Sequence, residues 1–285
     1  RPGLHGATML TPEEIATYKE HGFLPGRQML SDEEATDMRE ACIRTCGVEW
    51  ENPGRRQATN RLKPYLLFDW AADLVRHPVI LDHLEILMGP DILVFHTTVW
   101  FKEPQSLKAV PWHQDATYFG LSPFEHVTAW VALTPSTEEM GCMQFLPGTH
   151  GEGQLLHADK PNPDLMLSRG QTIAKDIDET GAVSLIMQPG EVSFHHTLAI
   201  HRSCPNTTDE PRIGIGISYI PTRVRHVGET RLSATLVRGT DGYGHFDLEP
   251  TLSEEKNDAA AAVHADSIGR FHKASEAIPE MGLVH

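Results

Sequence analysis

The feature that most constrains the fold of this chain is a change of sequence pattern at Asp91. From that residue on, short β-rich runs alternate with Gly- and Pro-containing breaks, whereas the preceding third carries helical signals. Many short strands with such punctuation are typical of a β-sandwich or a jelly roll. We therefore predict a mainly β protein with flanking helices. The expected strands are Ile92 to Phe101, Val127 to Thr134, Cys142 to Leu146, Glu191 to His195 and Ile213 to Ile220.

Helix-start signals fill the first third of the chain. Thr11 to Glu14 combines a capping Thr, a Pro at the first helical position and an acidic first turn. Ser31 to Glu34 follows the same logic and predicts a helix that ends near Gly47. A short strand is expected at Gly22 to Pro25, and another helical stretch should end at Gly89.

We find no internal repeat and no linker, and therefore predict one domain over residues 1–285. Within it, residues 1–90 are expected to be mostly helical, and residues 91–225 to form the jelly-roll core. Residues 226–285 are expected to form an acidic tail with a helical piece near Asp258 to Val263. The polar, poorly patterned stretch from Gly151 to Gly181 is interpreted as a flap over a site.

Composition excludes several classes of partner. A formal net charge of -15 argues against a nucleic-acid partner, because phosphate binding needs a concentrated cationic face. No apolar run is long enough for a membrane helix, and no signal-peptide pattern opens the chain. The four cysteines are too sparse for a disulfide scaffold, so we expect reduced thiols in a cytoplasmic protein. The oligomeric state is not predicted.

His113 and Asp115 form a His-x-Asp pattern, and His201 follows far downstream. On one extended strand, the side chains of His113 and Asp115 would point to the same side. Two imidazoles and one carboxylate are the ligand set of non-haem Fe(II) oxygenases. The alternative is a surface pair or a hydrogen-bonded core histidine, since the chain has 17 His. Arg212 adds a guanidinium suited to a small dicarboxylate such as 2-oxoglutarate, unless it pairs with Asp209 or Glu210 at the surface.

Several motifs together resemble the phytanoyl-CoA dioxygenase family, a branch of the Fe(II)/2-oxoglutarate oxygenases. The resemblance implies a double-stranded β-helix core of the jelly-roll, cupin-like type, and extends from about Thr11 to Ile220. One departure is Arg202, where relatives usually have Gly; this side chain should point away from the iron, but it could narrow the mouth of the site. The matching segments are Trp112 to Phe119, Gly141 to His150, and His201 and Ser203 with Asn206 and Arg212.

Carried over by position, the resemblance implies a set of ligands and a cosubstrate pocket. His113, Asp115 and His201 would bind Fe(II), and Arg212 and Ser203 would hold the distal carboxylate of 2-oxoglutarate. The resemblance places Thr98, Trp130 and Arg61 along the cosubstrate pocket, although Lys63 could take the place of Arg61. Trp130 could instead be plain core packing, and His195 and His196 are interpreted as structural or as supports for the metal ligands.

The activity that the resemblance implies is hydroxylation of an unactivated C–H bond by O2, with release of succinate and CO2. Halogenating relatives lack the carboxylate ligand, so the presence of Asp115 disfavours halogenation. A basic loop with Arg55, Arg56, Arg61 and Lys63 favours a small anionic substrate, although solvated loop charge explains it as well. Tyr118, Thr117 and Lys63 are the residues expected to contact it.

Two other classes remain open at this point. A non-catalytic jelly roll could bind a metal or a small ligand, although it would not need a dicarboxylate clamp beside an open metal site. A metal-dependent cupin isomerase or hydrolase would use the metal without consuming O2.

Overall fold

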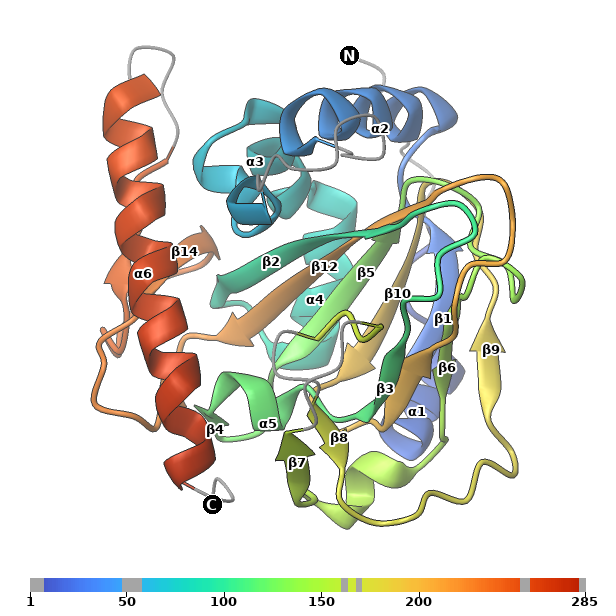
Figure 1. The fold of residues 1–285 in the computed structure, drawn as a ribbon. Coiled ribbons are helices and arrows are strands. Elements are labelled where there is room, and N and C mark those ends of the chain that lie inside the picture. The colour runs from blue at the N-terminus through green and yellow to red at the C-terminus, as the bar shows by residue number, and fades with distance from the viewer. Residues whose placement is uncertain (1–7, 48–57, 160–163, 168–170, 252–256, 282–285) are drawn as a thin grey trace.

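The computed structural model describes residues 8–47, 58–159, 164–167, 171–251 and 257–281. Its centre is a seven-stranded sheet with a smaller four-stranded sheet facing it, and helices cover the outer face of the larger sheet (Figure 1). The prediction of a mainly β core with flanking helices is therefore confirmed. Within the described residues, no helix is long and apolar enough to cross a membrane.

The N-terminal helices begin where their caps predict. Thr11 and Ser31 each accept a hydrogen bond from a backbone N–H three residues on, and the Glu at that position reaches back to the cap. Both predicted helix starts are therefore confirmed. The helices of this part are α1 (Pro12–His21), α2 (Asp32–Cys46), the 3-10 turns η2 (Ala58–Arg61) and η3 (Pro64–Leu66), α3 (Asp69–Val75) and α4 (Pro78–Met88).

The larger sheet has the order β1-β10-β5-β12-β2-β14-β15, and all of its pairs are antiparallel except β14 with β15. The expected strands all lie in this sheet or in the smaller one, with boundaries shifted by a few residues at most. The strands of the larger sheet are β1 (Phe23–Gln28), β2 (Ile92–Lys102), β5 (Val127–Ala132), β10 (Glu191–His196), β12 (Arg212–Pro221), β14 (Ser233–Arg238) and β15 (Asp247–Leu248).

The smaller sheet has the order β3-β11-β6-β9, from β3 (Val110–His113), β11 (His201–Ser203), β6 (Met143–Phe145) and β9 (Val183–Leu185). The predicted flap contains a short hairpin of β7 and β8, and the rest of it lies partly outside the described residues. The remaining elements are α5 (Ala116–Phe119), η4 (Thr149–Glu152), β4 (Leu121–Ser122), β7 (His157–Asp159), β8 (Gln171–Ile173) and β13 (Arg225–His226).

The alternation along β12 divides the interior into two layers. Ile213, Ile215 and Ile217 are buried in the cluster that also holds the helices α3 and α4. Gly214 lies on the opposite face, where a Cβ would approach the Trp130 ring to 2.1 Å. Because glycine leaves this space empty, the Trp130 indole fits between the two sheets, where the cavity described below is found.

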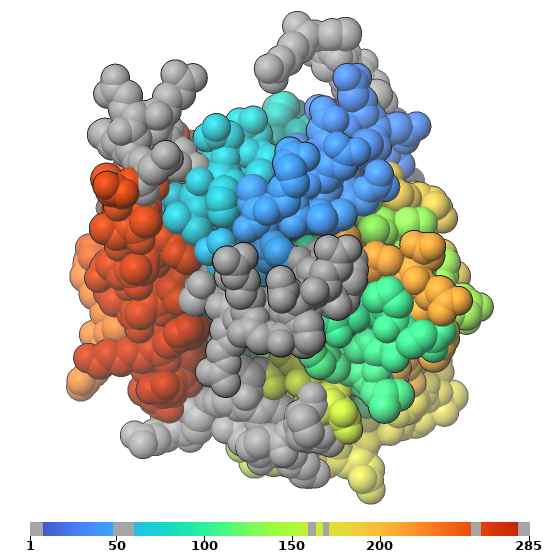
Figure 2. Space-filling model, turned by 45° about the horizontal axis from the view of Figure 1, so that its top comes forward, coloured from blue at the N-terminus to red at the C-terminus, as the bar shows by residue number. Residues whose placement is uncertain are grey.

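The C-terminal part is more than a tail. β14 pairs with β2 and extends the larger sheet, and α6 (Asn257–Met281) is far longer than the expected helical piece. Phe271 of α6 stacks on His96 of β2, with ring centroids 4.1 Å apart. In Figure 2, α6 (red) stands beside the N-terminal helical part (cyan), and His264 contacts the Leu62 carbonyl oxygen at 2.8 Å.

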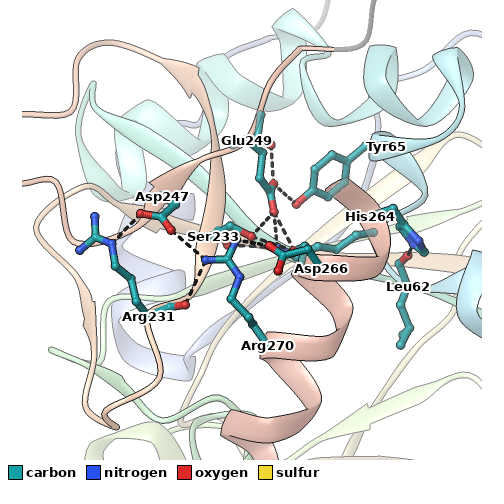
Figure 3. A network of polar contacts seen from close by, with 12 residues as sticks. Leu62, Tyr65, Arg231, Ser233, Asp247, Glu249, His264, Asp266 and Arg270 are labelled. Atoms are coloured by element: carbon teal, nitrogen blue, oxygen red, sulfur yellow. Dashed lines mark hydrogen bonds and ion pairs between the residues drawn. The ribbon is translucent and has the colours of Figure 1, made fainter. Parts of the chain in front are cut away.

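A buried polar network around Glu249 connects this C-terminal part to the rest of the molecule, and Figure 3 shows Glu249 with Tyr65 and Ser233. Lys63 donates to Glu249 at 2.6 Å, and both side chains are almost completely buried. Glu249 also accepts hydrogen bonds from Tyr65, Ser233, Thr235 and Ser267. These donors come from three separate segments, so this one carboxylate joins η3, β14 and α6.

Candidate metal centre

Three side chains meet between the two sheets in the arrangement that a metal ion needs. His113 ends β3 and His201 begins β11, and the two residues are directly paired across the sheet. One ligand atom each from His113, Asp115 and His201 can be chosen so that all lie within 4.8 Å of one another. Asp115 Oδ1 lies 3.4 Å from His113 Nε2 and 3.7 Å from His201 Nε2.

The route by which Asp115 reaches the site differs from the prediction. We expected His113 and Asp115 on one strand, but β3 ends at His113 and Asp115 caps the short helix α5 with helical dihedral angles, φ -61° and ψ -34°. The chain therefore turns immediately after the first histidine. The carboxylate meets the imidazole because of this turn and not because of strand alternation.

Both histidines are oriented by backbone carbonyls. His113 Nδ1 lies 2.9 Å from the Pro111 oxygen, and His201 Nδ1 lies 3.0 Å from the Ala199 oxygen. A carbonyl oxygen only accepts, so each Nδ1 carries the proton and each Nε2 presents a bare lone pair toward Asp115 Oδ1. Three electron-pair donors that converge in this way suit a metal cation.

The electrostatics agree with this arrangement. Burial lowers the pKa of His201 well below its ordinary value, so the imidazole stays neutral and can donate its lone pair. Burial disfavours the ionised form of Asp115, but the charge and hydrogen bonds of the surrounding imidazoles favour it and hold the pKa of that carboxyl well below its usual range. An ionised carboxylate surrounded by imidazoles is a donor set that suits a divalent metal.

A cavity of about 620 Å³ opens next to these ligands. It reaches from the metal ligands to α6, which contributes His272, Ser275 and Glu276 to its wall. Of the site residues expected from the sequence, the following line this cavity: Arg61, Thr98, His113, Asp115, Thr117, Tyr118, Trp130, His201, Ser203 and Arg212.

Arg212 is the buried cation of the cavity. Its exposed fraction is only 2%, its guanidinium donates to the Gly141 oxygen, and it lies 5.3 Å from the centre of the Trp130 ring. Its Nε has no hydrogen-bond partner among the described residues. Burial lowers the pKa of Arg212 to about 10, which leaves it charged at neutral pH. This burial rules out the alternative of a surface ion pair with Asp209 or Glu210.

The other basic residues lie in different surroundings. Lys63 does not line the cavity, because its ammonium is committed to Glu249. Arg61 does line it, with its guanidinium 4.7 Å from the Phe101 ring centre and donating to the Gly47 oxygen at 2.9 Å. Arg202 is held at the cavity wall by Glu179 at 2.7 Å. Arg55 and Arg56 fall outside the described residues.

Sequence reasoning missed Thr128 and gave no definite role to His195. Thr128 Oγ1 donates to Asp115 Oδ2 at 3.1 Å, and His195 Nε2 lies 3.2 Å from the same oxygen. The only sequence signal for Thr128 is a hydroxyl at the start of an otherwise apolar buried strand. That signal is weak, because Thr is also common in strands for reasons of conformation alone.

A 2-His-1-carboxylate site beside a cavity, set between the sheets of a jelly roll, defines a class of protein: the non-haem iron oxygenases. A family model described as "Phytanoyl-CoA dioxygenase (PhyH)" matches residues 18–214. The chain belongs to the phytanoyl-CoA dioxygenase family. Its cofactors are those of the family, Fe(II) and 2-oxoglutarate, and the bare lone pairs of the three ligands fit such an ion.

Individual relatives agree with this assignment. The peroxisomal phytanoyl-CoA dioxygenase of Homo sapiens is 30% identical over 232 residues, which cover 74% of this chain and 68% of the human protein. A solved structure of the non-heme monooxygenase ThoJ, in its apo form, has a TM-score of 0.82 and 32% identity, and the match covers 93% of this chain and 98% of ThoJ. A structure titled "CytC3 with Fe(II) and alpha-ketoglutarate" shares the fold, with a TM-score of 0.64 and 24% identity over 85% of this chain and 93% of that one.

These findings confirm three predictions: the family, the double-stranded β-helix fold and the iron- and 2-oxoglutarate-dependent dioxygenase class. The alternatives of a non-catalytic binding module and of a cupin isomerase or hydrolase are thereby set aside. Which molecule the enzyme oxidises is a separate question, since the family match alone does not identify a substrate.

Proposed function

We propose that this enzyme hydroxylates a C–H bond of a small anionic molecule. The observation that carries the proposal is the combination of an intact carboxylate ligand, Asp115, with a buried arginine, Arg212, in one cavity. With Asp115 present, two histidines and one carboxylate would hold the metal and leave room beside it for cosubstrate, substrate and O2. Loss of that carboxylate would be expected for halogenation.

Each ligand has a defined task in this proposal. His113 and His201 donate Nε2 to Fe(II), and Asp115 donates Oδ1. When bound, Fe(II) with 2-oxoglutarate supplies the oxidation of a C–H bond by O2, with succinate and CO2 as co-products. The protein's own part is to hold this geometry in a buried cavity, so that water is excluded while the reaction proceeds.

Arg212 and Ser203 are assigned to the distal carboxylate of 2-oxoglutarate. A guanidinium presents parallel N–H donors that match a carboxylate, and the Nε of Arg212 lacks a partner within the described residues. Ser203 is 3% exposed, lies on β11, the strand that begins with His201, and lines the same cavity. Trp130 and Thr98 form the adjoining walls.

Support for an anionic substrate comes from Arg61. Its guanidinium donates to the backbone carbonyls of Cys46 and Gly47 and lies over the Phe101 ring, and among the described residues no carboxylate pairs with it. By contrast, Arg202 is neutralised by Glu179 and Arg223 by Glu125. Arg61 therefore brings a positive charge to the cavity that a carboxylate, phosphonate or acyl thioester can meet. Tyr118 and Thr117 follow Asp115 in the chain and line the same cavity, and they are the proposed further contacts of the substrate.

The identity of the substrate should depend on α6. His272, Ser275 and Glu276 line the cavity, yet they lie beyond residues 18–214, which the family model matches. A wall built from this segment can differ from relatives without disturbing the metal ligands. We therefore assign general chemistry to the matched part and substrate choice to the C-terminal helix.

The test is succinate release from 2-oxoglutarate by the Fe(II)-loaded enzyme in the presence of O2. Candidate carboxylates, phosphonates and acyl thioesters are compared with uncharged analogues of the same size. The proposal expects stimulation by one anionic class and none with His113→Ala. Stimulation by the uncharged analogues to the same degree would overturn the anionic part, and failure of the wild-type enzyme to form the coloured anaerobic complex with Fe(II) and 2-oxoglutarate would overturn the whole.

A further inference from the structure

We propose that a directional chain of hydrogen bonds, from Thr197 through His126 to Thr128, positions Asp115 so that only its Oδ1 is offered to the metal. The proposal rests on the proposed function, because it concerns the ligand that keeps part of the metal's coordination open. None of the three residues is itself a ligand. They are positioning residues that act through Asp115.

Hydrogen-bond distances connect the side chains of Thr197, His126, Thr128 and Asp115 without a gap. Thr197 Oγ1 lies 3.0 Å from His126 Nδ1, and His126 Nε2 lies 3.1 Å from Thr128 Oγ1. Thr128 Oγ1 then lies 3.1 Å from Asp115 Oδ2. His126 is completely buried, and Thr197 and Thr128 have exposed fractions of 2% and 6%, so the chain runs through the interior.

The chemistry of the groups fixes the direction of each bond. An ionised carboxylate only accepts, so Thr128 must spend its single hydroxyl proton on Asp115. The hydroxyl oxygen of Thr128 then accepts from His126, which places the proton of that imidazole on Nε2. His126 Nδ1 is left as an acceptor for the Thr197 hydroxyl. Burial lowers the pKa of His126 to about 3, in agreement with a neutral ring that has one donor and one acceptor.

Thr197, which directly follows β10, also fixes the backbone next to Asp115. The Thr197 carbonyl oxygen accepts from the Ala116 N–H at 3.0 Å, and the Thr197 N–H donates to the His126 oxygen at 3.1 Å. Thr197 therefore holds both the residue after Asp115 and the imidazole that orients Thr128. Position and rotation of the carboxylate are determined together.

The consequence concerns how many metal positions the carboxylate takes. Oδ2 has two donors, Thr128 and His195, whereas Oδ1 faces the bare Nε2 atoms of the histidines. A carboxylate without these donors can rotate and bind through both oxygens, which occupies a position that 2-oxoglutarate, substrate or O2 requires. Outer partners of metal ligands typically change metal affinity by about 10- to 100-fold when removed.

The experiment compares three variants by anaerobic titration with Fe(II), which requires no turnover. Thr128→Val removes the hydroxyl at constant shape, and Thr128→Ser retains it. Thr97→Val is the matched control, because Thr97 is 1% exposed and its hydroxyl has no partner among the described residues. The dissociation constant of Fe(II) and the position of the Fe(II)–2-oxoglutarate absorption band are measured for each.

We expect Thr128→Val to bind Fe(II) about 10-fold or more weakly and to shift the band, with Thr128→Ser and Thr97→Val close to the wild type. A folded Thr128→Val protein with wild-type affinity and an unshifted band would overturn the inference. If Thr128→Val does not fold, Thr197→Val cuts the chain farther from the metal and should show the same changes at smaller size; their absence there would overturn it equally. A wild-type protein that binds no Fe(II) would overturn the proposed function as well.

Discussion

Two carboxylates inside this molecule differ in how far the protein satisfies them: the half-buried Asp115 of the metal centre and the buried Glu249 of the C-terminal part. The oxygens of Glu249 are both saturated: Oε1 accepts from Lys63, Ser233 and Ser267, and Oε2 from Tyr65 and Thr235. Asp115 has donors on Oδ2 alone, and its Oδ1 faces two nitrogen lone pairs. Each carboxylate is ionised, but only one retains a lone pair for a ligand.

The comparison teaches how a structural acid differs from a functional one. Burial of a charge is costly unless hydrogen bonds and an opposite charge compensate it. Glu249 obtains this compensation from the protein, so it serves to join segments. Asp115 obtains part of it from Thr128 and His195 and leaves the rest to a metal ion. The degree of saturation therefore indicates function more directly than burial does.

The largest expected effect comes from removing a histidine ligand next to Asp115. In His201→Ala, Fe(II) affinity should fall by more than about 100-fold, a larger change than removal of an outer partner would cause. Succinate formation should drop to background, while the metal-free protein should still unfold cooperatively, because both donors to Asp115 Oδ2, Thr128 and His195, remain. Anaerobic Fe(II) titration checks the loss of affinity, and calorimetry checks the unfolding of the metal-free protein. Retained iron affinity would mean that the triad is misassigned.

The next effect concerns the saturated carboxylate. Lys63→Met leaves the charge of Glu249 buried without its ion partner, which should cost about 3–5 kcal/mol in the free energy of unfolding. Fe(II) affinity of the folded fraction should be unchanged, because Lys63 does not line the cavity. Urea unfolding is measured with Lys108→Met, an exposed lysine, as the control. Equal stability of the two variants would contradict a structural role for Glu249.

Arg212 provides a third comparison, between a bidentate cation and a point charge. Arg212→Lys keeps the charge but loses the planar pair of donors, and the half-saturating concentration of 2-oxoglutarate should rise by about 10- to 100-fold, as expected from hydrogen bonds to charged groups. The rate at saturation should fall less. Steady-state kinetics of succinate release measure both quantities, and Arg231→Lys at the exposed ion pair with Asp247 serves as the control. An unchanged 2-oxoglutarate requirement would remove Arg212 from the cosubstrate site.

The most gradual effect is a dependence of stability on pH in the metal-free protein. Burial depresses the pKa of His126 to about 3 and that of His96 well below 6.5, so the unfolded chain binds protons that the folded chain does not. Stability should therefore fall as pH drops below about 6.5, by about 1.4 kcal/mol per pH unit for each such histidine.

The depressed pKa of Glu249 adds a second decline, which begins only near pH 4.5, because its contribution is present above the unfolded pKa and is lost below it. Thermal unfolding between pH 7 and pH 5 measures the first window and unfolding between pH 4.5 and pH 3 the second, and Glu249→Gln should flatten only the second. A flat profile from pH 7 to pH 5 would show that the buried histidines take up protons in the folded state.

Much of the fold could be predicted because its signals are local. Thr11 and Ser31 predict their helices together with a Glu three residues further on. The strands after Asp91 can be predicted from their β-rich composition and from the Gly and Pro residues between them. The ligands His113, Asp115 and His201 were also predictable, since an ion with three protein ligands constrains residue type strongly. Arg212 followed from the same motif.

The sequence by itself thus determined the elements, the family and the metal ligands of this protein. Tertiary structure decided the orientation of Asp115. β3 ends at His113, Asp115 caps α5, and the donors Thr128 and His195 come from other strands. It also decided that Lys63 pairs with Glu249, 186 positions away, instead of facing a substrate. Local patterns fix local conformation, but partners of buried charges are chosen by folding, because only folding removes the water that would otherwise solvate them.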